Sequence, residues 1–343
     1  MRTMISVEIL DYCTRRCLHC CNGARPNGRL MSRKDLIYVV ELIKSRPKRS
    51  TIMPIDLNGE LLLHPNLGEV LDLFHSNELS VGVLTRGFTS KEKSRQDLQY
   101  KNFRALINRI EAGYKIGVEL SFDVYGFGGN KEQNLDALLC TIPELIDILS
   151  YVRVRMTLSP ERKNETCELL MEAFRRRGLF GPRFDEDFAR RNWGEILESI
   201  LSNKDETLSR SLRIYGKRKN LVDITAGRLD GAGRAKNLYE TYRRKIICDH
   251  FDAEIAPTFF IDPGLDIKYC CSYQTGNIPP FSNLHRNPSA ILSDESKPSL
   301  DFANYLLAIE EMQKRFDKKG KGDICDYCVR VLPDCLKKTS RVL

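Results

Sequence analysis

Three cysteines near the N-terminus constrain this chain more than any other feature. Cys13, Cys17 and Cys20 form the pattern C-x3-C-x2-C directly after the apolar residues 5–10. Thiolates are soft ligands that select iron–sulfur clusters, zinc or copper(I). In a loop that leaves a strand, three thiolates at this spacing can hold three irons of a cubane cluster and leave the fourth iron open to a substrate. The sequence therefore predicts a [4Fe–4S] cluster with chemistry at its open iron.

A buried helix is the alternative at these cysteines, because free cysteine packs as a small apolar residue. The spacing would place all three on one helical face. However, the residues between them include Arg15, Arg16 and His19, and the segment CNGARPNG at 21–28 is rich in turn-forming residues. This composition favours a ligand-bearing loop.

A second motif, LNGELLLHP at residues 57–65, follows the next apolar run. Glycine has no Cβ, so the backbone at Gly59 can approach a ligand closely. With the cysteine triplet, this segment resembles the motifs of the radical S-adenosylmethionine (SAM) enzymes, whose GGEP-type segment holds the methionyl amino group of SAM. The resemblance implies this role for Asn58, Gly59 and both the backbone and the acidic side chain of Glu60. Asn58 replaces the first glycine of the pattern, and Leu61 replaces its proline.

The composition fits one large domain and one small one. The 343 residues are 42% apolar and 29% charged, and no apolar run approaches the roughly 18 to 20 residues of a membrane span. The N-terminus lacks a signal-peptide pattern, so we expect a cytoplasmic protein. Most of the 12 cysteines gather towards the two ends of the chain, which indicates metal ligands in a reducing compartment. The net charge of +8 is scattered and lacks the interleaved aromatic residues of a nucleic-acid interface.

Strand-like apolar runs alternate with helical segments over the first 160 residues. This alternation predicts right-handed βαβ units and a parallel sheet, with functional groups at the carboxyl ends of the strands. Ser32 and Asp35 form a capping-box pattern that opens the first helix. The family resemblance implies an α/β fold with a partial (β/α)6 TIM-like barrel, which the alternation matches. We expect strands at residues 5–10, 52–57, 79–84, 117–122, 151–157 and 220–225, and helices at 32–45, 66–77, 91–112 and 134–149.

The ends of three later strands supply further cofactor-binding candidates. Thr85 lies in LTRG, which resembles the third-strand TNG of the family, and Ser121 and Asp123 resemble its S-x-D. The resemblance implies that Ser121 and Asp123 face the SAM carboxylate or ribose. Arg153 and Arg155 alternate with apolar residues, so both point to one face, where an arginine fork suits a carboxylate. The alternatives are solvent-facing or ion-paired arginines and, for Asp123, a turn-initiating residue.

The C-terminal part of the chain carries a second set of cysteines. An early cysteine, a hairpin-like pair of apolar runs around an Asp-Pro-Gly turn and a distant C-x2-C resemble the SPASM and twitch extensions of radical SAM enzymes, which bind auxiliary [4Fe–4S] clusters. The cysteines after Cys328 are too few for a second auxiliary cluster, which favours the shorter, twitch-like form. A zinc site with four cysteine ligands is the rival, because spacing alone does not separate zinc from iron–sulfur. The resemblance assigns Cys248, Cys270, Cys325 and Cys328 to one auxiliary cluster, with Cys271 an alternative to Cys270 and Cys335 a substitute ligand.

Residues 160–219 exceed the length of a simple barrel crossover. Helical segments at 161–177 and 194–212 would cover the mouth of the barrel or serve as decoration, and a glycine-rich loop follows at 227–237. The expected organisation is a barrel over residues 1–226 with a helical insert at 160–219, a linker over 227–247 and a small α+β auxiliary domain over 248–343.

The resemblance implies a radical reaction. The N-terminal cluster passes an electron to SAM, which is cleaved to methionine and a 5′-deoxyadenosyl radical, and this radical abstracts hydrogen from an unactivated C–H bond. An auxiliary cluster suits an oxidation, because it can accept the second electron from the substrate. The alternative is epimerisation, in which a thiol returns a hydrogen atom. Cys140 and Cys167 are the candidates for this donor, or else they are buried core cysteines.

The substrate is expected to be a small molecule such as a sugar, aminocyclitol or nucleoside. Many relatives with SPASM-type extensions modify peptides and carry an N-terminal leader-binding domain, for which the early first strand leaves no room. A peptide-modifying maturase is the alternative function, and a non-catalytic iron–sulfur or zinc scaffold is a second one. We also expect a reducing electron donor such as flavodoxin or ferredoxin, and neither nucleic acid nor membrane as a partner.

Overall fold

The computed structural model describes most of the N-terminal half of the chain and parts of the remainder. The described residues are 4–18, 27–45, 55–122, 124–149, 151–158, 162–176, 211–215, 221–228, 258–268, 280, 282–288, 300–319 and 324–339.

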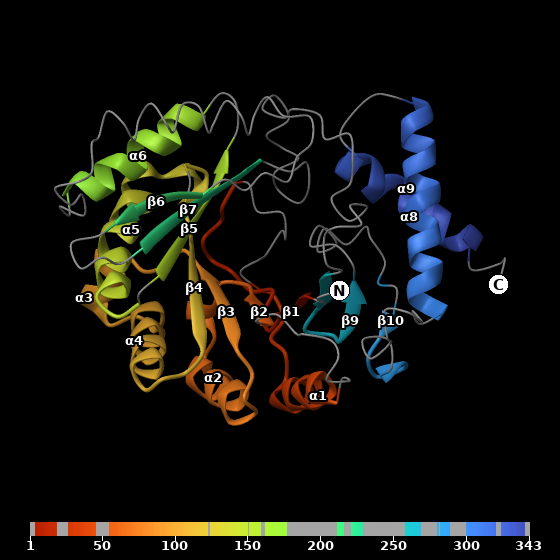
Figure 1. The fold of residues 1–343 in the computed structure, drawn as a ribbon, viewed down its shortest axis with the longest axis horizontal. Coiled ribbons are helices and arrows are strands. Elements are labelled where there is room, and N and C mark those ends of the chain that lie inside the picture. The colour runs from red at the N-terminus through yellow and green to blue at the C-terminus, as the bar shows by residue number, and fades with distance from the viewer. Residues whose placement is uncertain are drawn as a thin grey trace.

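A mixed sheet forms the centre of the fold (Figure 1). Its strands are β1 (Met4–Glu8), β2 (Ile55–Asn58), β3 (Val81–Thr85), β4 (Ile116–Ser121), β5 (Tyr151–Leu158), β6 (Ser211–Tyr215), β7 (Leu221–Arg228), β8 (Thr258–Ile261), β9 (Asp266–Lys268) and β10 (Ser282–Asn283). They lie in the order β10-β9-β8-β1-β2-β3-β4-β5-β7-β6. Strands β1 to β5 and β7 are parallel neighbours in chain order. The expected parallel sheet is therefore confirmed, with strand limits that differ by a few residues.

Helices connect the parallel strands and pack over the sheet. The helices between these strands are α1 (Arg33–Lys44), α2 (Leu67–Ser76), α3 (Ser90–Arg95), α4 (Leu98–Glu111), α5 (Lys131–Ile146) and α6 (Lys163–Arg176). Helices α8 (Leu300–Lys319) and α9 (Ile324–Thr339) follow β10. The 3-10 turns η1 (Leu61–Leu63) and η2 (Gly126–Gly129) follow β2 and β4. The expected cap of α1 is present, since the Ser32 hydroxyl accepts a hydrogen bond from the Asp35 N–H at 3.1 Å.

The single helix expected over residues 91–112 is two helices. Helix α3 begins with a capping box in which Thr89 and Glu92 bond reciprocally. It ends at Gln96, whose backbone is left-handed with φ of 55°, and α4 begins immediately after Asp97. Non-glycine residues seldom adopt this conformation, so the apolar periodicity of the segment did not reveal the break.

The two faces of the sheet differ in chemistry at β4. Ile116, Val118 and Leu120 are buried, whereas Glu119 and Ser121, which alternate with them, are half-buried. Side chains alternate between the faces of a strand, so the apolar set packs in the core and the polar set lies on the opposite face. The core includes fully buried residues of the helices, such as Phe74 of α2.

Part of the long connection before β7 is a strand and not a helix. The sequence predicted a helix over residues 194–212, but Ser211 and Leu212 lie in β6, which pairs antiparallel with β7. Leu212 and Ile214 alternate with polar residues, a pattern typical of a strand. Residues 194–210 lie outside the described part of the chain. Helix α6 confirms the helical segment expected at 161–177.

A hairpin from the C-terminal part of the chain extends the sheet beside β1. Strands β8 and β9 pair antiparallel across the expected turn, and β8 pairs parallel with β1. Helices α8 and α9 pack against each other, with the Phe316 and Tyr327 rings 5.3 Å apart, and lie across the molecule from α6 in Figure 1. The limits of the barrel, linker and auxiliary domain stay predictions. Among the described residues, no helix is long and apolar enough to cross a membrane.

Replacing Leu106 with alanine tests the placement of the core. Leu106 is fully buried on α4, so its truncation removes apolar contacts and leaves a cavity. We expect Leu106→Ala to lower the free energy of unfolding by about 2–5 kcal/mol in a denaturant titration. Leu98→Ala makes the same change at a 39% exposed position of the same helix and should cost no more than about 0.5 kcal/mol. Equal losses would contradict this core.

Candidate functional site

The segment after β1 carries the first two cysteines of the predicted cluster site. We call residues 13–18 the cluster loop; its backbone is not helical, which excludes the buried-helix alternative for this part. Cys13 is half-buried and Cys17 is buried, and neither forms a disulfide. The backbone N–H of Arg15 donates a hydrogen bond to the Sγ of Cys13 at 3.4 Å. One cysteine sulfur of the loop therefore accepts a hydrogen bond from the backbone, as the thiolate ligands of iron–sulfur clusters often do.

The turn after β2 brings the second motif against the first. Gly59 has a left-handed backbone with φ of 99°, and an added Cβ would lie 2.3 Å from the carbonyl oxygen of Leu10. Asn58 lies opposite Glu8 in the parallel register of β2 and β1. The chain itself thus requires glycine at this position, in addition to the ligand approach predicted from the sequence.

Glu60 joins the ends of β2 and β3. Its side chain is 5% exposed, and its carboxylate accepts hydrogen bonds from the Thr85 hydroxyl and from the Arg86 N–H, the latter at 3.1 Å. The Thr85 hydroxyl in turn accepts from the Gly87 N–H at 3.0 Å. Both side chains are therefore engaged within the protein, and their contacts with a cofactor stay predictions.

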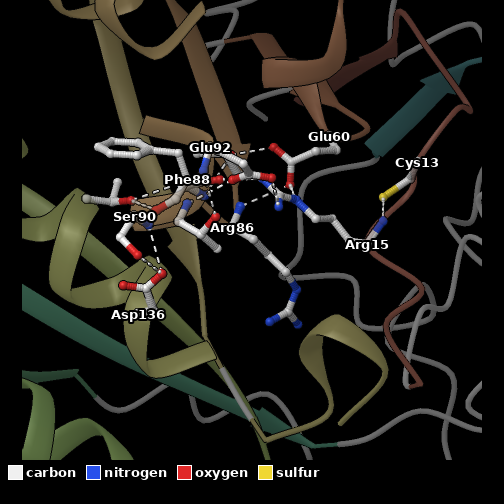
Figure 2. A network of polar contacts seen from close by, with 12 residues as sticks. Cys13, Arg15, Glu60, Arg86, Phe88, Ser90, Glu92 and Asp136 are labelled. Carbon is white, nitrogen blue, oxygen red and sulfur yellow. Dashed lines mark hydrogen bonds and ion pairs between the residues drawn. The ribbon is translucent and has the colours of Figure 1, made fainter. Parts of the chain in front are cut away.

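Arg15 lies at the centre of a buried network in the cluster loop (Figure 2). Its side chain is 4% exposed. Nη1 donates to Glu92 Oε1 at 2.7 Å, Nη2 donates to the Gly87 carbonyl at 2.7 Å, and Nε lies 3.9 Å from Glu60 Oε2. The guanidinium carbon lies 4.8 Å from the centroid of the Phe127 ring, within cation–π range. One side chain thus links the cluster loop to the segments after β2, β3 and β4.

The Glu92 carboxylate binds both the start of α3 and Arg15 of the cluster loop. Its Oε2 accepts the Thr89 N–H at 2.8 Å, which closes the capping box of α3, while its Oε1 accepts from Arg15. Glu92 was not among the site residues predicted from the sequence. The T-x-x-E spacing at residues 89–92 is the signal that could have revealed it, because this spacing is typical of a capping box at a helix start.

The two arginines of β5 lie on one face, as predicted. Arg153 Nη1 lies 3.6 Å from Glu119 Oε2, and Arg155 Nη1 lies 3.4 Å from Glu119 Oε1. Both arginine side chains are substantially exposed, at 46% and 61%. Ser121 follows Glu119 on the same side of β4. We call these four residues the polar face; ion pairing with Glu119, one of the alternatives left open, is present here.

A second network ties the C-terminal hairpin to the segment after β1. The carboxylate of Asp262, 1% exposed as a residue, accepts hydrogen bonds from Lys268 Nζ and Arg29 Nη2, each at 3.1 Å. Arg29 Nε donates to Asp11 Oδ2 at 3.1 Å. Burial opposes ionisation of Asp262, but Lys268, Arg29 and a backbone amide hold its pKa below the ordinary value. The sequence predicted the turn at Asp262 but not this contact.

The two candidate hydrogen donors lie in the helical layer. Cys140 is half-buried on α5, with its thiol 3.7 Å from Asp136 Oδ1, and Cys167 on α6 is part of the apolar core. These surroundings favour the core-cysteine interpretation. A hydrogen-donor role for either residue stays a prediction.

The auxiliary cysteines are described only in part. Cys325 and Cys328 lie in the first turns of α9, and Cys328 is half-buried. Cys335 on the same helix is fully buried in the core, and burial raises the pKa of its thiol. A role for Cys335 as a substitute ligand stays a prediction.

Several predicted ligands fall outside the described residues. Within the described part of the chain, no three His, Cys, Asp or Glu side chains are placed together to hold a metal ion. The predicted metal ligands that lie outside it are Cys20, Cys248, Cys270 and Cys271, and the predicted SAM-facing residue Asp123 lies outside it as well.

Comparison with solved structures identifies the fold. The chain matches Streptococcus suis SuiB bound to its precursor peptide SuiA with a TM-score of 0.51 at 11% identity, over 86% of this chain and 65% of the SuiB chain. It matches SuiB bound to S-adenosylmethionine with a TM-score of 0.50 at 11% identity, over 86% and 66% of the two chains. The chain thus spans just under two thirds of the SuiB chain.

BtrN, solved with AdoMet and 2-DOIA, is matched at 13% identity over 95% of this chain and 92% of that one, with a TM-score of 0.44 on which no conclusion rests. No protein-family model and no curated protein matches the sequence. The chain therefore shares the α/β fold of SuiB, which is consistent with the resemblance to radical SAM enzymes found in the sequence.

Gly59→Ala tests the contact between the second motif and Leu10, which precedes the cluster loop. Both strain at positive φ and the clash with Leu10 oppose a side chain here, so we expect a loss of several kcal/mol in unfolding free energy, on the order of 3. Gly113→Ala is the matched control, because Gly113 also has positive φ, of 89°, but nothing lies within 4 Å of its Cβ position. It should cost only about 1 kcal/mol. Equal melting curves for the two variants would refute the close approach.

Proposed function

We propose that this protein is a radical SAM enzyme that abstracts hydrogen from an unactivated C–H bond of a small polar substrate. The observation that carries the proposal is the meeting of the cluster loop with the Gly59–Glu60 turn at the carboxyl ends of parallel strands. The six parallel strands in chain order support a partial (β/α)6 barrel, in which this edge holds the site.

The residues at this edge suit the proposed cofactors. Cys13 and Cys17 lie outside disulfides in a non-helical loop, and Cys20 would complete a three-thiolate set. The missing Cβ of Gly59 lets its backbone lie against Leu10, in the segment that leads into this loop. A [4Fe–4S] cluster with an open iron, together with SAM, would supply one electron and the 5′-deoxyadenosyl radical that abstracts hydrogen.

The polar face supports a polar substrate. Glu119, Arg153 and Arg155 present charged hydrogen-bonding groups on exposed or half-buried side chains of β4 and β5. These groups suit the hydroxyl, amine or carboxylate groups of a sugar, aminocyclitol or nucleoside. Glu119, Arg153 and Arg155 would orient the substrate. Arg153 and Arg155 are also candidates to bind the carboxylate of SAM.

A peptide is the second candidate substrate. The fold likeness to SuiB favours it, because SuiB was solved with its precursor peptide SuiA. A peptide would meet the same polar face, and the protein would then introduce a cross-link, a thioether or an inverted centre.

The predicted auxiliary cluster would serve an oxidation. In that outcome the substrate loses a hydrogen atom to the radical and then an electron and a proton, with the auxiliary cluster as the electron acceptor. Cys325 and Cys328 on α9 are the proposed ligands that the structure describes in part. Flavodoxin or ferredoxin is the proposed donor to the N-terminal cluster. Epimerisation remains the alternative outcome.

Formation of 5′-deoxyadenosine tests the proposed chemistry. We expect the anaerobically reconstituted, reduced protein to form it from SAM, and Cys17→Ala to abolish it, because the cluster would lose a ligand. Cys140→Ala removes a thiol from α5 and should keep this activity. Mass spectrometry of the quenched reaction gives the result. Product from Cys17→Ala at the wild-type rate would overturn the proposal, and iron-loaded protein that neither forms product nor binds SAM would favour a scaffold.

Iron content tests the auxiliary cluster. We expect Cys328→Ala to lower the iron of the reconstituted protein from about eight to about four atoms per chain while 5′-deoxyadenosine formation without substrate continues. Cys140→Ala again serves as the thiol control and should retain all of the iron. Unchanged iron in Cys328→Ala would exclude Cys328 as a ligand, and zinc in place of iron would support the zinc alternative.

A further inference from the structure

We infer that Arg15 is a positioning residue, which fixes the cluster loop against the predicted SAM-binding turn and thereby sets the affinity for SAM. The inference rests on the proposed function and deepens it. Arg15 lies between the ligand candidates Cys13 and Cys17, yet its side chain points away from solvent into the network of Figure 2.

The contacts of Arg15 reach the segments that carry the other predicted SAM contacts. Glu60 belongs to the turn after β2, and Gly87 follows Thr85 at the end of β3. Phe127 belongs to η2, which follows β4. Because these segments are far apart in the sequence, a single side chain that contacts all three restricts how the cluster loop can move relative to them.

The geometry of the guanidinium matters as well as its charge. Nη1 and Nη2 are used by Glu92 and the Gly87 carbonyl, and Nε faces Glu60 without a hydrogen-bond partner within the described residues. A planar fork can address these acceptors together, whereas the single ammonium of lysine is a point charge on a flexible stem. Arginine therefore suits the two acceptors and the neighbouring Glu60 carboxylate better than lysine would.

The charged side chains that Arg15 contacts are largely buried with it. Arg15 is 4% exposed and its two carboxylate neighbours, Glu60 and Glu92, are 5% and 14% exposed. Removing the arginine would leave two buried carboxylates without their shared counter-charge, which is costly in a site of low polarity. A change at Arg15 should therefore displace the loop as well as weaken the fold, and the two effects have to be separated.

Two backbone features link the position of Arg15 to the positions of Cys13 and Cys17. The Arg15 N–H donates to Cys13 Sγ, and Arg16 adopts a left-handed backbone with φ of 52° immediately before Cys17. Arg15 thus lies between its backbone hydrogen bond to Cys13 and the tight bend at Arg16 that leads to Cys17. Supporting contacts of this kind orient metal ligands, and their loss typically costs 10-fold to 100-fold in affinity or activity.

The test uses the full-length reconstituted protein with SAM itself as the probe. The variants are Arg15→Lys, Arg15→Met and the double variant Arg15→Met with Glu92→Gln, with Arg16→Met as the control that removes an exposed arginine from the same loop. The readouts are iron content, the melting temperature of the iron-free protein, and the dissociation constant of SAM from the change it causes in the electron paramagnetic resonance spectrum of the reduced cluster.

We expect Arg15→Lys to take up iron and to bind SAM about 10-fold to 100-fold more weakly than wild type, and Arg16→Met to match wild type. The double variant removes one unpaired carboxylate, so its melting temperature should rise above that of Arg15→Met while its weak SAM binding persists. This comparison remains informative if Arg15→Met alone fails to fold.

Wild-type SAM affinity in Arg15→Lys, or recovery of affinity together with stability in the double variant, would overturn the inference and assign Arg15 a purely structural role. A wild-type protein that takes up no iron would instead overturn the proposed function, and the inference with it.

Discussion

The parallel pairing of β1, β2 and β3 is the constraint on which the site depends. It brings the carboxyl ends of three strands to one edge, and the close approach of Gly59 to Leu10 joins the first two of these ends. The carboxylate of Glu60 then binds the end of β3 through Thr85 and Arg86. The two sequence motifs are therefore held together by the protein alone, which is the arrangement that an enzyme needs if it is to bind a cofactor without large rearrangement.

Charge is distributed unequally around this edge. The side of the cluster loop is buried and internally paired, with Arg15 between Glu60 and Glu92. The polar face on β4 and β5 is more open, and its two arginines share the carboxylate of Glu119. Buried, satisfied charges rigidify a structure, whereas exposed pairs exchange readily with water or a ligand. The first region thus suits a fixed cofactor site, and the second suits a polar ligand, either the substrate or the carboxylate of SAM.

The sequence predicted those features that depend on local patterns. The strand–helix alternation and the cap at Ser32 are present in the structure, as is the hairpin at Asp262. The break at Gln96 was missed because a left-handed glutamine leaves the apolar periodicity intact. Strand β6 was missed because its first two residues, Ser211 and Leu212, were assigned to the end of a longer helical pattern. The networks were not predictable in the same way. Arg15 and Glu92 are 77 residues apart, and the fold buries Arg15 while it exposes its neighbour Arg16. Only the arrangement of the strand ends decides between these two arginines.

We propose that the cysteines after β1 hold a cluster whose open iron binds SAM. Mössbauer spectroscopy of protein reconstituted with iron-57 tests it most directly, because it reports the coordination of individual iron sites. We predict that SAM changes the signal of a single iron site of the N-terminal cluster and that this change is absent from Cys17→Ala. A spectrum that SAM leaves unaltered, in protein that contains its full complement of iron, would contradict it.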